Sequence, residues 1–208
     1  MMVHPVGLGA MPLSIEGRPG RAEAVAVIRT ALEAGIDLVD TADCYCLDET
    51  EIGHNERLVA EAISGWKGGR DILVATKGGV TRPDGGWLHD GRPEHLARAC
   101  EASLAALRAD AIGLYYLHAV DRRVPIEESV GEIARLRDQG KIRHVGLSNV
   151  GVAEIDAAEA VVPIAAVQNA AGPYDPAGLD DGVLSRCQAG GIAFVAHSPM
   201  GGWRAGRI

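Results

Sequence analysis

The sequence has little of what would mark a nucleic-acid-binding, membrane or secreted protein. Its 208 residues carry 28 acidic side chains against 20 Lys and Arg, a formal net charge of −8, so there is no basic excess to attract nucleic acid. No apolar run approaches the roughly 20 residues that span a bilayer. The first residues lack the basic segment of a signal peptide, and Pro5 and Pro12 interrupt their apolar side chains. We therefore expect a cytoplasmic protein with no nucleic-acid or membrane partner.

Cysteine is also scarce, and its spacing matches no common zinc motif. In the cytosol the four cysteines would be thiols. Cys44 and Cys46 are one residue apart, and the acidic stretch 48–51 has no cluster of histidines beside it. From these spacings we expect no metal site. Structural or incidental roles are expected for Cys44, Cys46, Cys100 and Cys187.

What the chain does have is 27 glycines and a regular alternation of short apolar runs with helical patterns. The runs recur about every 30 residues, the size of a βα unit, and they are continuous, which is typical of parallel strands buried on both faces. They lie at 6–10, 36–41, 72–76, 112–118, 145–148, 165–168 and 192–197. No linker or charge block divides them, so we predict one domain over residues 1–208.

This alternation fits either an open doubly wound sheet or a closed (β/α)8 barrel. A dinucleotide-binding open sheet should carry G-x-G-x-x-G after its first strand, but Gly7-Leu8-Gly9-Ala10-Met11-Pro12 has proline in place of the third glycine. Polar residues instead follow successive runs. In a barrel those strand ends meet at one mouth, where the active site lies, so we predict the barrel. The polar residues at the ends are Asp40, Lys77, His118, Asn149, Gln168 and His197.

Four residues near these ends suit proton transfer to an oxygen. Asp40 and Lys77 end neighbouring strands, His118 ends the next, and Tyr45 lies in the loop after the second strand. A nearby ammonium lowers the pKa of a phenol from about 10, which would make Tyr45 a usable acid while His118 orients a carbonyl. Each residue alone is more simply explained as a cap, a surface charge or a core side chain. Their joint placement favours a site.

Six motifs occur in order along the chain. They are Val39-Asp40-Thr41-Ala42-Asp43-Cys44-Tyr45 followed by Gly53-His54-Asn55-Glu56, then Ala75-Thr76-Lys77-Gly78-Gly79, Leu114-Tyr115-Tyr116-Leu117-His118, Gly146-Leu147-Ser148-Asn149 and Val167-Gln168-Asn169. In these motifs the chain resembles the aldo/keto reductases. The resemblance implies a (β/α)8 barrel that binds NADP(H), or less often NAD(H), and reduces a small aldehyde or ketone to an alcohol.

The resemblance also assigns roles to residues. It implies that Tyr45 is the general acid, that Lys77 and Asp40 tune it, and that His118 orients the carbonyl. It implies that Ser148, Asn149 and Gln168 bind the nicotinamide carboxamide. His197 stands where the family has an aromatic residue that stacks on the nicotinamide, so it either stacks or simply packs. The full set of implied cofactor positions is Met11, Asp40, Ser148, Asn149, Gln168, His197, Ser198, Met200 and Gly201.

The chain also departs from the family. It stops soon after the seventh run, so we expect the eighth strand and its helix, with the segment that holds the adenosine 2′-phosphate, to be missing. The unpaired strand edges of the open barrel could then bind a protein partner or a second copy of the chain. This leaves a non-catalytic relative that senses cofactor or binds a protein as an alternative. Another barrel enzyme, such as an isomerase, fits Ser148-Asn149 and Gln168 less well. Trp87, Arg122 and Arg123 either line a substrate pocket or belong to solvated loops.

Overall fold

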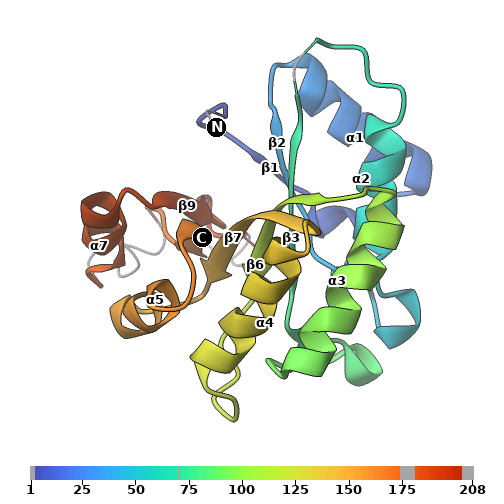
Figure 1. The fold of residues 1–208 in the computed structure, drawn as a ribbon. Coiled ribbons are helices and arrows are strands. Elements are labelled where there is room, and N and C mark those ends of the chain that lie inside the picture. The colour runs from blue at the N-terminus through green and yellow to red at the C-terminus, as the bar shows by residue number, and fades with distance from the viewer. Residues whose placement is uncertain (1–2, 70, 174–180, 203–208) are drawn as a thin grey trace.

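In the computed structural model, which describes residues 3–69, 71–173 and 181–202, seven parallel strands form one sheet. Each strand pairs with the one before it, in the order β1-β2-β3-β6-β7-β8-β9. The barrel expectation is confirmed: the sheet is nearly closed and helices cover its outside (Figure 1). The strands are β1 (Leu8–Gly9), β2 (Leu38–Asp40), β3 (Leu73–Gly78), β6 (Ile112–Leu117), β7 (Ile142–Ser148), β8 (Ile164–Ala170) and β9 (Ala193–His197).

Every predicted run contains a strand, and the strand ends differ from the predicted ends by up to three residues. β1 keeps only two residues of the predicted 6–10. β7 begins three residues before the predicted 145–148, because Ile142 pairs with Ile112 in the parallel ladder. The exposed side chains of Arg143 and His144 interrupt the apolar pattern there, so the sequence did not indicate where the strand begins.

The helices form an outer layer in chain order. α1 packs on α2, α2 on α3, α3 on α4 and α4 on α5, and Figure 1 shows α3 and α4 side by side along the strands. Pro93 occupies the first turn of α3, where its missing N–H has no intrahelical partner to lose. The α-helices described are α1 (Arg21–Glu33), α2 (His54–Ile63), α3 (Pro93–Leu107), α4 (Ile126–Asp138), α5 (Val152–Glu159) and α7 (Val183–Gly190).

Short elements sit in the loops at the carboxyl ends of the strands. The 3₁₀ helices η1 (Met11–Leu13) and η2 (Glu49–Glu51) follow β1 and β2. After β3, the strands β4 (Val80–Thr81) and β5 (Leu88–His89) form an antiparallel hairpin around η3 (Pro83–Gly85). The sequence indicated only a Gly/Asp-rich loop in this region, since each strand of the hairpin has two residues and no alternation to detect.

The central strands β3, β6, β7 and β8 are largely buried on both faces, whereas β1 and β9 are partly exposed. Between strands and helices lie large apolar side chains such as Ile28, Leu96, Ile133, Leu147 and Ile155, each fully buried. A second cluster is formed from alternate strand positions, Ala75, Leu114, Tyr116 and Ala166. Gly146 makes room for it, because a Cβ there would lie 2.4 Å from Cδ1 of Tyr116. Cores on both faces explain why the strand sequences are continuously apolar.

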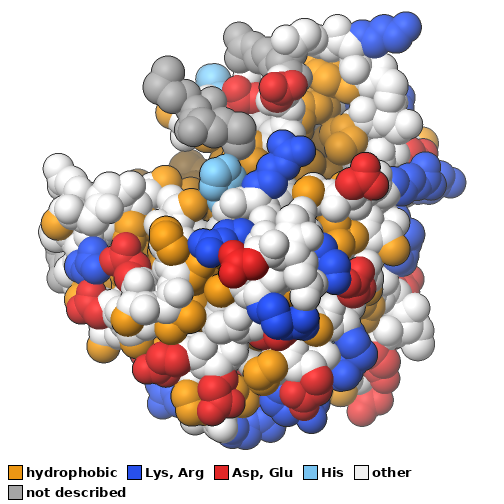
Figure 2. All heavy atoms as spheres, in the orientation of Figure 1, with side chains coloured by type: hydrophobic (Ala, Val, Ile, Leu, Met, Phe, Trp, Pro, Cys, Tyr) orange, Lys and Arg blue, Asp and Glu red, His pale blue; other side chains and the backbone are white. Residues whose placement is uncertain are grey.

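The sheet has two ends in the part of the chain that is described. β1 and β9 each pair on one side only, and no further strand of this sheet is among the described residues. Acidic and basic side chains are interspersed over the face that α3 and α4 present in Figure 2. None of the described helices is long and apolar enough to cross a membrane.

Candidate active site

A fully buried lysine lies at the centre of the mouth. Lys77, near the end of β3, directs its ammonium toward three oxygens: Oδ2 of Asp40 at 2.7 Å, the carbonyl of Thr41 at 2.9 Å and the hydroxyl of Tyr45 at 3.1 Å. An ammonium has three N–H donors, so each proton of Lys77 has an acceptor. The predicted contact between Asp40, Lys77 and Tyr45 is confirmed by this geometry.

The charges at this centre are set by burial and by the ion pair. Burial lowers the pKa of Lys77, but Asp40 and Tyr45 outweigh it and raise the pKa overall, so the ammonium persists. Burial raises the pKa of Tyr45 to about 12, against the opposing effect of Lys77. The expectation that Tyr45 has a lowered pKa is therefore wrong. Lys77 acts in the expected direction, but loss of water around the phenol has the larger effect.

His118 follows β6 directly and meets Tyr45 edge to face, with ring centroids 5.6 Å apart. Burial and the charge of Lys77 hold the pKa of His118 well below its usual value, so the imidazole is neutral near pH 7. Its Nδ1 lies 3.4 Å from Sγ of Cys44. The other ring nitrogen, Nε2, is therefore the one left for a ligand.

Amide and hydroxyl groups from β7 and β8 extend the site. Nε2 of Gln168 donates to Oδ1 of Asp40 at 2.9 Å, and Nδ2 of Asn149 donates to the carbonyl of His118 at 3.0 Å. Asn149 takes a left-handed backbone conformation (φ 58°), which asparagine tolerates better than most residues. Ser148 is buried beside it, with Oγ 3.0 Å from the same Nδ2. These three predicted residues therefore gather at one end of the sheet.

The remaining predicted cofactor residues lie at or after the carboxyl ends of β1 and β9. Nε2 of His197 lies 3.1 Å from Oδ1 of Asn149, so His197 contacts the same group of polar residues. Met11 packs against the small cluster that contains Cys44 and Tyr45. Ser198, Met200 and Gly201 form the turn after β9, where Met200 is 67% exposed. The stacking role of His197 stays a prediction.

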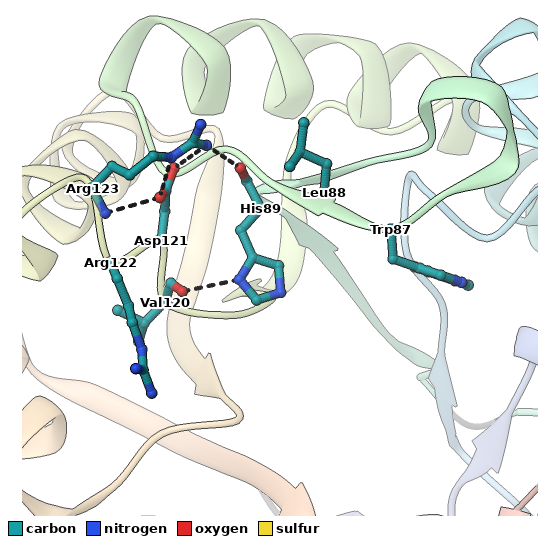
Figure 3. A pocket seen from close by; sticks show the side chains of 7 residues that line it. All are labelled: Trp87, Leu88, His89, Val120, Asp121, Arg122 and Arg123. Carbon is teal, nitrogen blue, oxygen red and sulfur yellow. Dashed lines mark hydrogen bonds and ion pairs between the residues drawn. The ribbon is translucent and has the colours of Figure 1, made fainter.

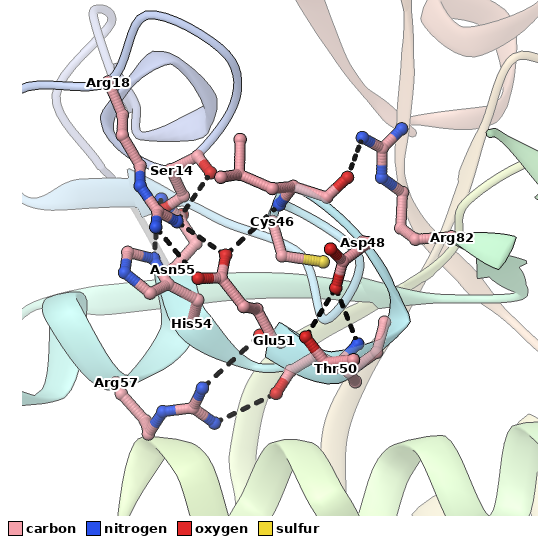
Figure 4. A network of polar contacts seen from close by, with 12 residues as sticks. Ser14, Arg18, Cys46, Asp48, Thr50, Glu51, His54, Asn55, Arg57 and Arg82 are labelled. Atoms are coloured by element: carbon pink, nitrogen blue, oxygen red, sulfur yellow. Dashed lines mark hydrogen bonds and ion pairs between the residues drawn. The ribbon is translucent and has the colours of Figure 1, made fainter. Parts of the chain in front are cut away.

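The loop that carries Tyr45 is held by residues to which the sequence analysis gave no role (Figure 4). Arg18 donates to both carboxylate oxygens of Glu51, at 2.7 and 2.9 Å. Asn55 is fully buried: its amide donates to the carbonyl of Ala10, and its oxygen accepts from Thr41. The motif Gly53-His54-Asn55-Glu56 contained Asn55, but nothing in the sequence showed that it bridges the first two strand ends.

A hollow of about 430 Å³ opens beside the hairpin (Figure 3). Trp87, half exposed at its edge, meets the ring of Tyr45 edge-on at 6.5 Å between centroids. Asp121 accepts from Arg123 at 2.9 Å, whereas Arg122 points away from that pair in Figure 3. Trp87 is thus the lining residue that contacts Tyr45. The hollow is lined by Trp87, Leu88, His89, Val120, Asp121, Arg122 and Arg123.

This geometry coincides with a match to a family model. The model described as the aldo/keto reductase family matches residues 5–207, nearly the whole chain. The chain belongs to the aldo/keto reductase family. The six motifs noted in the sequence all lie within the matched residues, and Asp40, Tyr45, Lys77 and His118 meet at the mouth of an aldo/keto reductase barrel.

Solved aldo/keto reductase structures share this fold. A glycerol dehydrogenase from Gluconobacter oxydans is 30% identical (TM-score 0.82), with 93% of this chain and 59% of that chain covered. An aldo-keto reductase from Bacillus halodurans, in its holo form, is 28% identical (TM-score 0.80; 97% and 64%). One from Klebsiella pneumoniae, in complex with NADP and acetate, is 26% identical (TM-score 0.77; 99% and 66%). The chain therefore spans less than two thirds of the length of these three relatives.

Proposed function

We propose that this aldo/keto reductase barrel reduces aldehydes or ketones with hydride from NADP(H), or alternatively NAD(H), and that Tyr45 is its general acid. The observation that carries the proposal is the contact of the Tyr45 hydroxyl with the buried ammonium of Lys77, 3.1 Å away. The second observation is the neutral imidazole of His118 beside the same phenol. Tyr45, as proton donor, and His118, as the hydrogen-bond donor that orients the carbonyl, therefore lie next to each other at the mouth.

The mouth fits the nicotinamide end of such a cofactor. Because Nε2 of Gln168 already donates to Asp40, its carbonyl oxygen is left to accept from the carboxamide nitrogen. The hydroxyl of Ser148 supplies a further donor, and Oδ1 of the exposed Asn149 supplies a further acceptor. We infer that these three residues hold the carboxamide, and that the bound cofactor supplies the hydride.

His118 would then orient the substrate carbonyl, and Tyr45 would donate the proton. The free ring nitrogen of His118 donates to the carbonyl oxygen and fixes its position near Tyr45. As negative charge grows on that oxygen, Tyr45 transfers its proton to it. The resulting phenolate is stabilised by the ammonium of Lys77, whose own charge is balanced by Asp40 at 2.7 Å. A pKa of about 12 keeps the phenol protonated until the acceptor oxygen has become basic.

The test is Tyr45→Phe, assayed by consumption of NADPH with an aromatic aldehyde. General acid catalysis contributes roughly 10²- to 10⁴-fold, so a loss of that size is expected. Tyr115→Phe is the matched control, because it removes a buried phenol oxygen that has no partner among the described residues and faces the helix layer. Full activity of Tyr45→Phe, or no turnover by wild-type protein saturated with NADPH, would contradict the proposal.

The alternative is a non-catalytic relative that binds cofactor or another protein. The one-sided pairing of β1 and β9 in the described part favours it, since an unpaired strand edge can accept a strand from a partner or a second copy. Titration of NADPH against tryptophan fluorescence separates the two. Binding without turnover supports the alternative, whereas binding with turnover supports the reductase.

A further inference from the structure

Three side chains with metal-binding atoms meet beside the mouth, from two separate parts of the chain. Asp43 and Cys44 belong to the loop after β2, and His118 follows β6. One ligand atom from each lies within 4.8 Å of the other two. Sγ of Cys44 is 3.4 Å from Nδ1 of His118, although the residues are 74 positions apart.

The carboxylate of this cluster has an oxygen without a partner. Asp43 is 3% exposed, and its Oδ1 is buried with no hydrogen-bond donor among the described residues. A buried polar atom without a partner is costly and uncommon in folded proteins. A cation held between Asp43, Cys44 and His118 would satisfy this oxygen directly.

The spacing suits a tetrahedral ion. Zinc binds cysteine sulfur at about 2.3 Å and imidazole nitrogen at about 2.0–2.1 Å, which at a tetrahedral angle places the two ligand atoms about 3.5 Å apart. The observed separation of Sγ and Nδ1 is 3.4 Å. Thiolate, imidazole and carboxylate together suit zinc and related transition metals, whereas magnesium and calcium prefer oxygen ligands alone.

We propose that Asp43, Cys44 and His118 form a binding site for a zinc-like divalent cation, with a fourth position left for water. On binding, the S–H bond of Cys44 breaks, the sulfur bonds to the metal, and the proton leaves to solvent; nothing is oxidised or reduced. The ion uses Nδ1 of His118, whereas the proposed carbonyl contact uses Nε2. Metal binding can therefore be measured without reference to reductase activity.

The test is titration of the tag-free, chelator-treated chain with Co²⁺. We expect one Co²⁺ per chain, a sulfur-to-cobalt charge-transfer band in the near ultraviolet, and loss of the band when Zn²⁺ is added. Cys44→Ser should abolish the band and weaken Zn²⁺ binding by more than about 10-fold, since even outer partners of metal ligands contribute 10- to 100-fold. Cys46→Ser is the matched control, because it changes another buried thiol two residues away.

Absence of the band in the wild-type chain would overturn the proposal. So would equal Zn²⁺ affinity of Cys44→Ser and the wild type, or loss of the band in Cys46→Ser alone. If Cys44→Ser does not fold by circular dichroism, X-ray absorption of the zinc-loaded wild type decides. One sulfur with nitrogen and oxygen neighbours supports the site, and two sulfurs, or none, contradict it.

Discussion

Gln168 and Asp40 are joined by a 2.9 Å hydrogen bond although 128 residues separate them in the sequence. Gln168 lies on β8 and Asp40 ends β2, so the bond connects the two halves of the strand order. The other carboxylate oxygen of Asp40 accepts from Lys77 at 2.7 Å. One carboxylate therefore positions both the lysine proposed to stabilise the phenolate and the amide proposed to bind nicotinamide.

Asp40→Asn should destabilise the fold, because it leaves the charge of the fully buried Lys77 without a counterion. Removing one member of a buried pair costs about 3–5 kcal/mol, and the partial exposure of Asp40 suggests a loss of ~2–3 kcal/mol in the free energy of unfolding. Urea denaturation measures this. Arg21→Gln, in an exposed pair with Glu61, should cost no more than ~0.5 kcal/mol. Equal losses in both variants would refute the argument.

Gly146→Ala and Gly131→Ala should change stability in opposite directions. A Cβ at Gly146 would lie 2.4 Å from the ring of Tyr116, so overpacking should lower stability by about 1–3 kcal/mol. A Cβ at Gly131, within α4, meets nothing within 4 Å, and alanine there should raise stability by about 0.5–1 kcal/mol. Thermal unfolding compares the two. A stabilised Gly146→Ala would show that the interior is not tightly packed.

Stability should fall as the pH drops from 7 to 5. Burial holds the pKa of His118 well below 6.5 and also lowers the pKa of His54 and His95. Near pH 6 the unfolded chain therefore binds more protons than the folded one, and protonation favours unfolding. His118→Gln should flatten this dependence in urea titrations at stepped pH. An unchanged slope would show that the pKa of His118 is the same in the folded and the unfolded chain.

Glu51→Gln should loosen the loop that carries Tyr45. Arg18 lowers the pKa of Glu51 to about 2, so the pair contributes stability above the ordinary carboxyl pKa and loses it as the pH falls toward 2. Both side chains are about one quarter exposed, so the loss at pH 7 should be ~1 kcal/mol or less. Faster amide hydrogen exchange over residues 46–53 is the expected local result. Glu132→Gln, in a pair on α4, should leave that segment unchanged.

The sequence predicted the strands and the contact of Asp40 with Lys77 because both depend on chain order. In a parallel sheet, consecutive strands lie side by side, so residues at their carboxyl ends must meet. The pKa of Tyr45 could not be predicted this way. It depends on how completely the surrounding chain, including the hairpin residue Trp87, removes water from the phenol, and the hairpin has too few residues to show a pattern.

Contacts between loops could not be predicted from the sequence either. Arg18 and Glu51 are 33 residues apart, and their ion pair follows from loop conformation, which has no periodicity to read. Cys44 and His118 follow strands that are not neighbours in the sheet order, and they are 74 residues apart in the sequence. The spacing of Cys44 and Cys46 therefore did not indicate the proposed metal site. The sequence left Arg122 and Trp87 either at a substrate pocket or in solvated loops. The structure places both around one hollow, and their role there stays a prediction.

The strand order has a consequence for synthesis on the ribosome. Because each strand pairs with its predecessor, every new βα unit finds its docking surface on chain that has already emerged, at about 5–20 residues per second. The ion pair of Asp40 with Lys77 can form once β3 is made, whereas Gln168 reaches Asp40 only after β8 appears. The proton-transfer half of the mouth is therefore assembled first, and the half proposed to bind nicotinamide is added to it later.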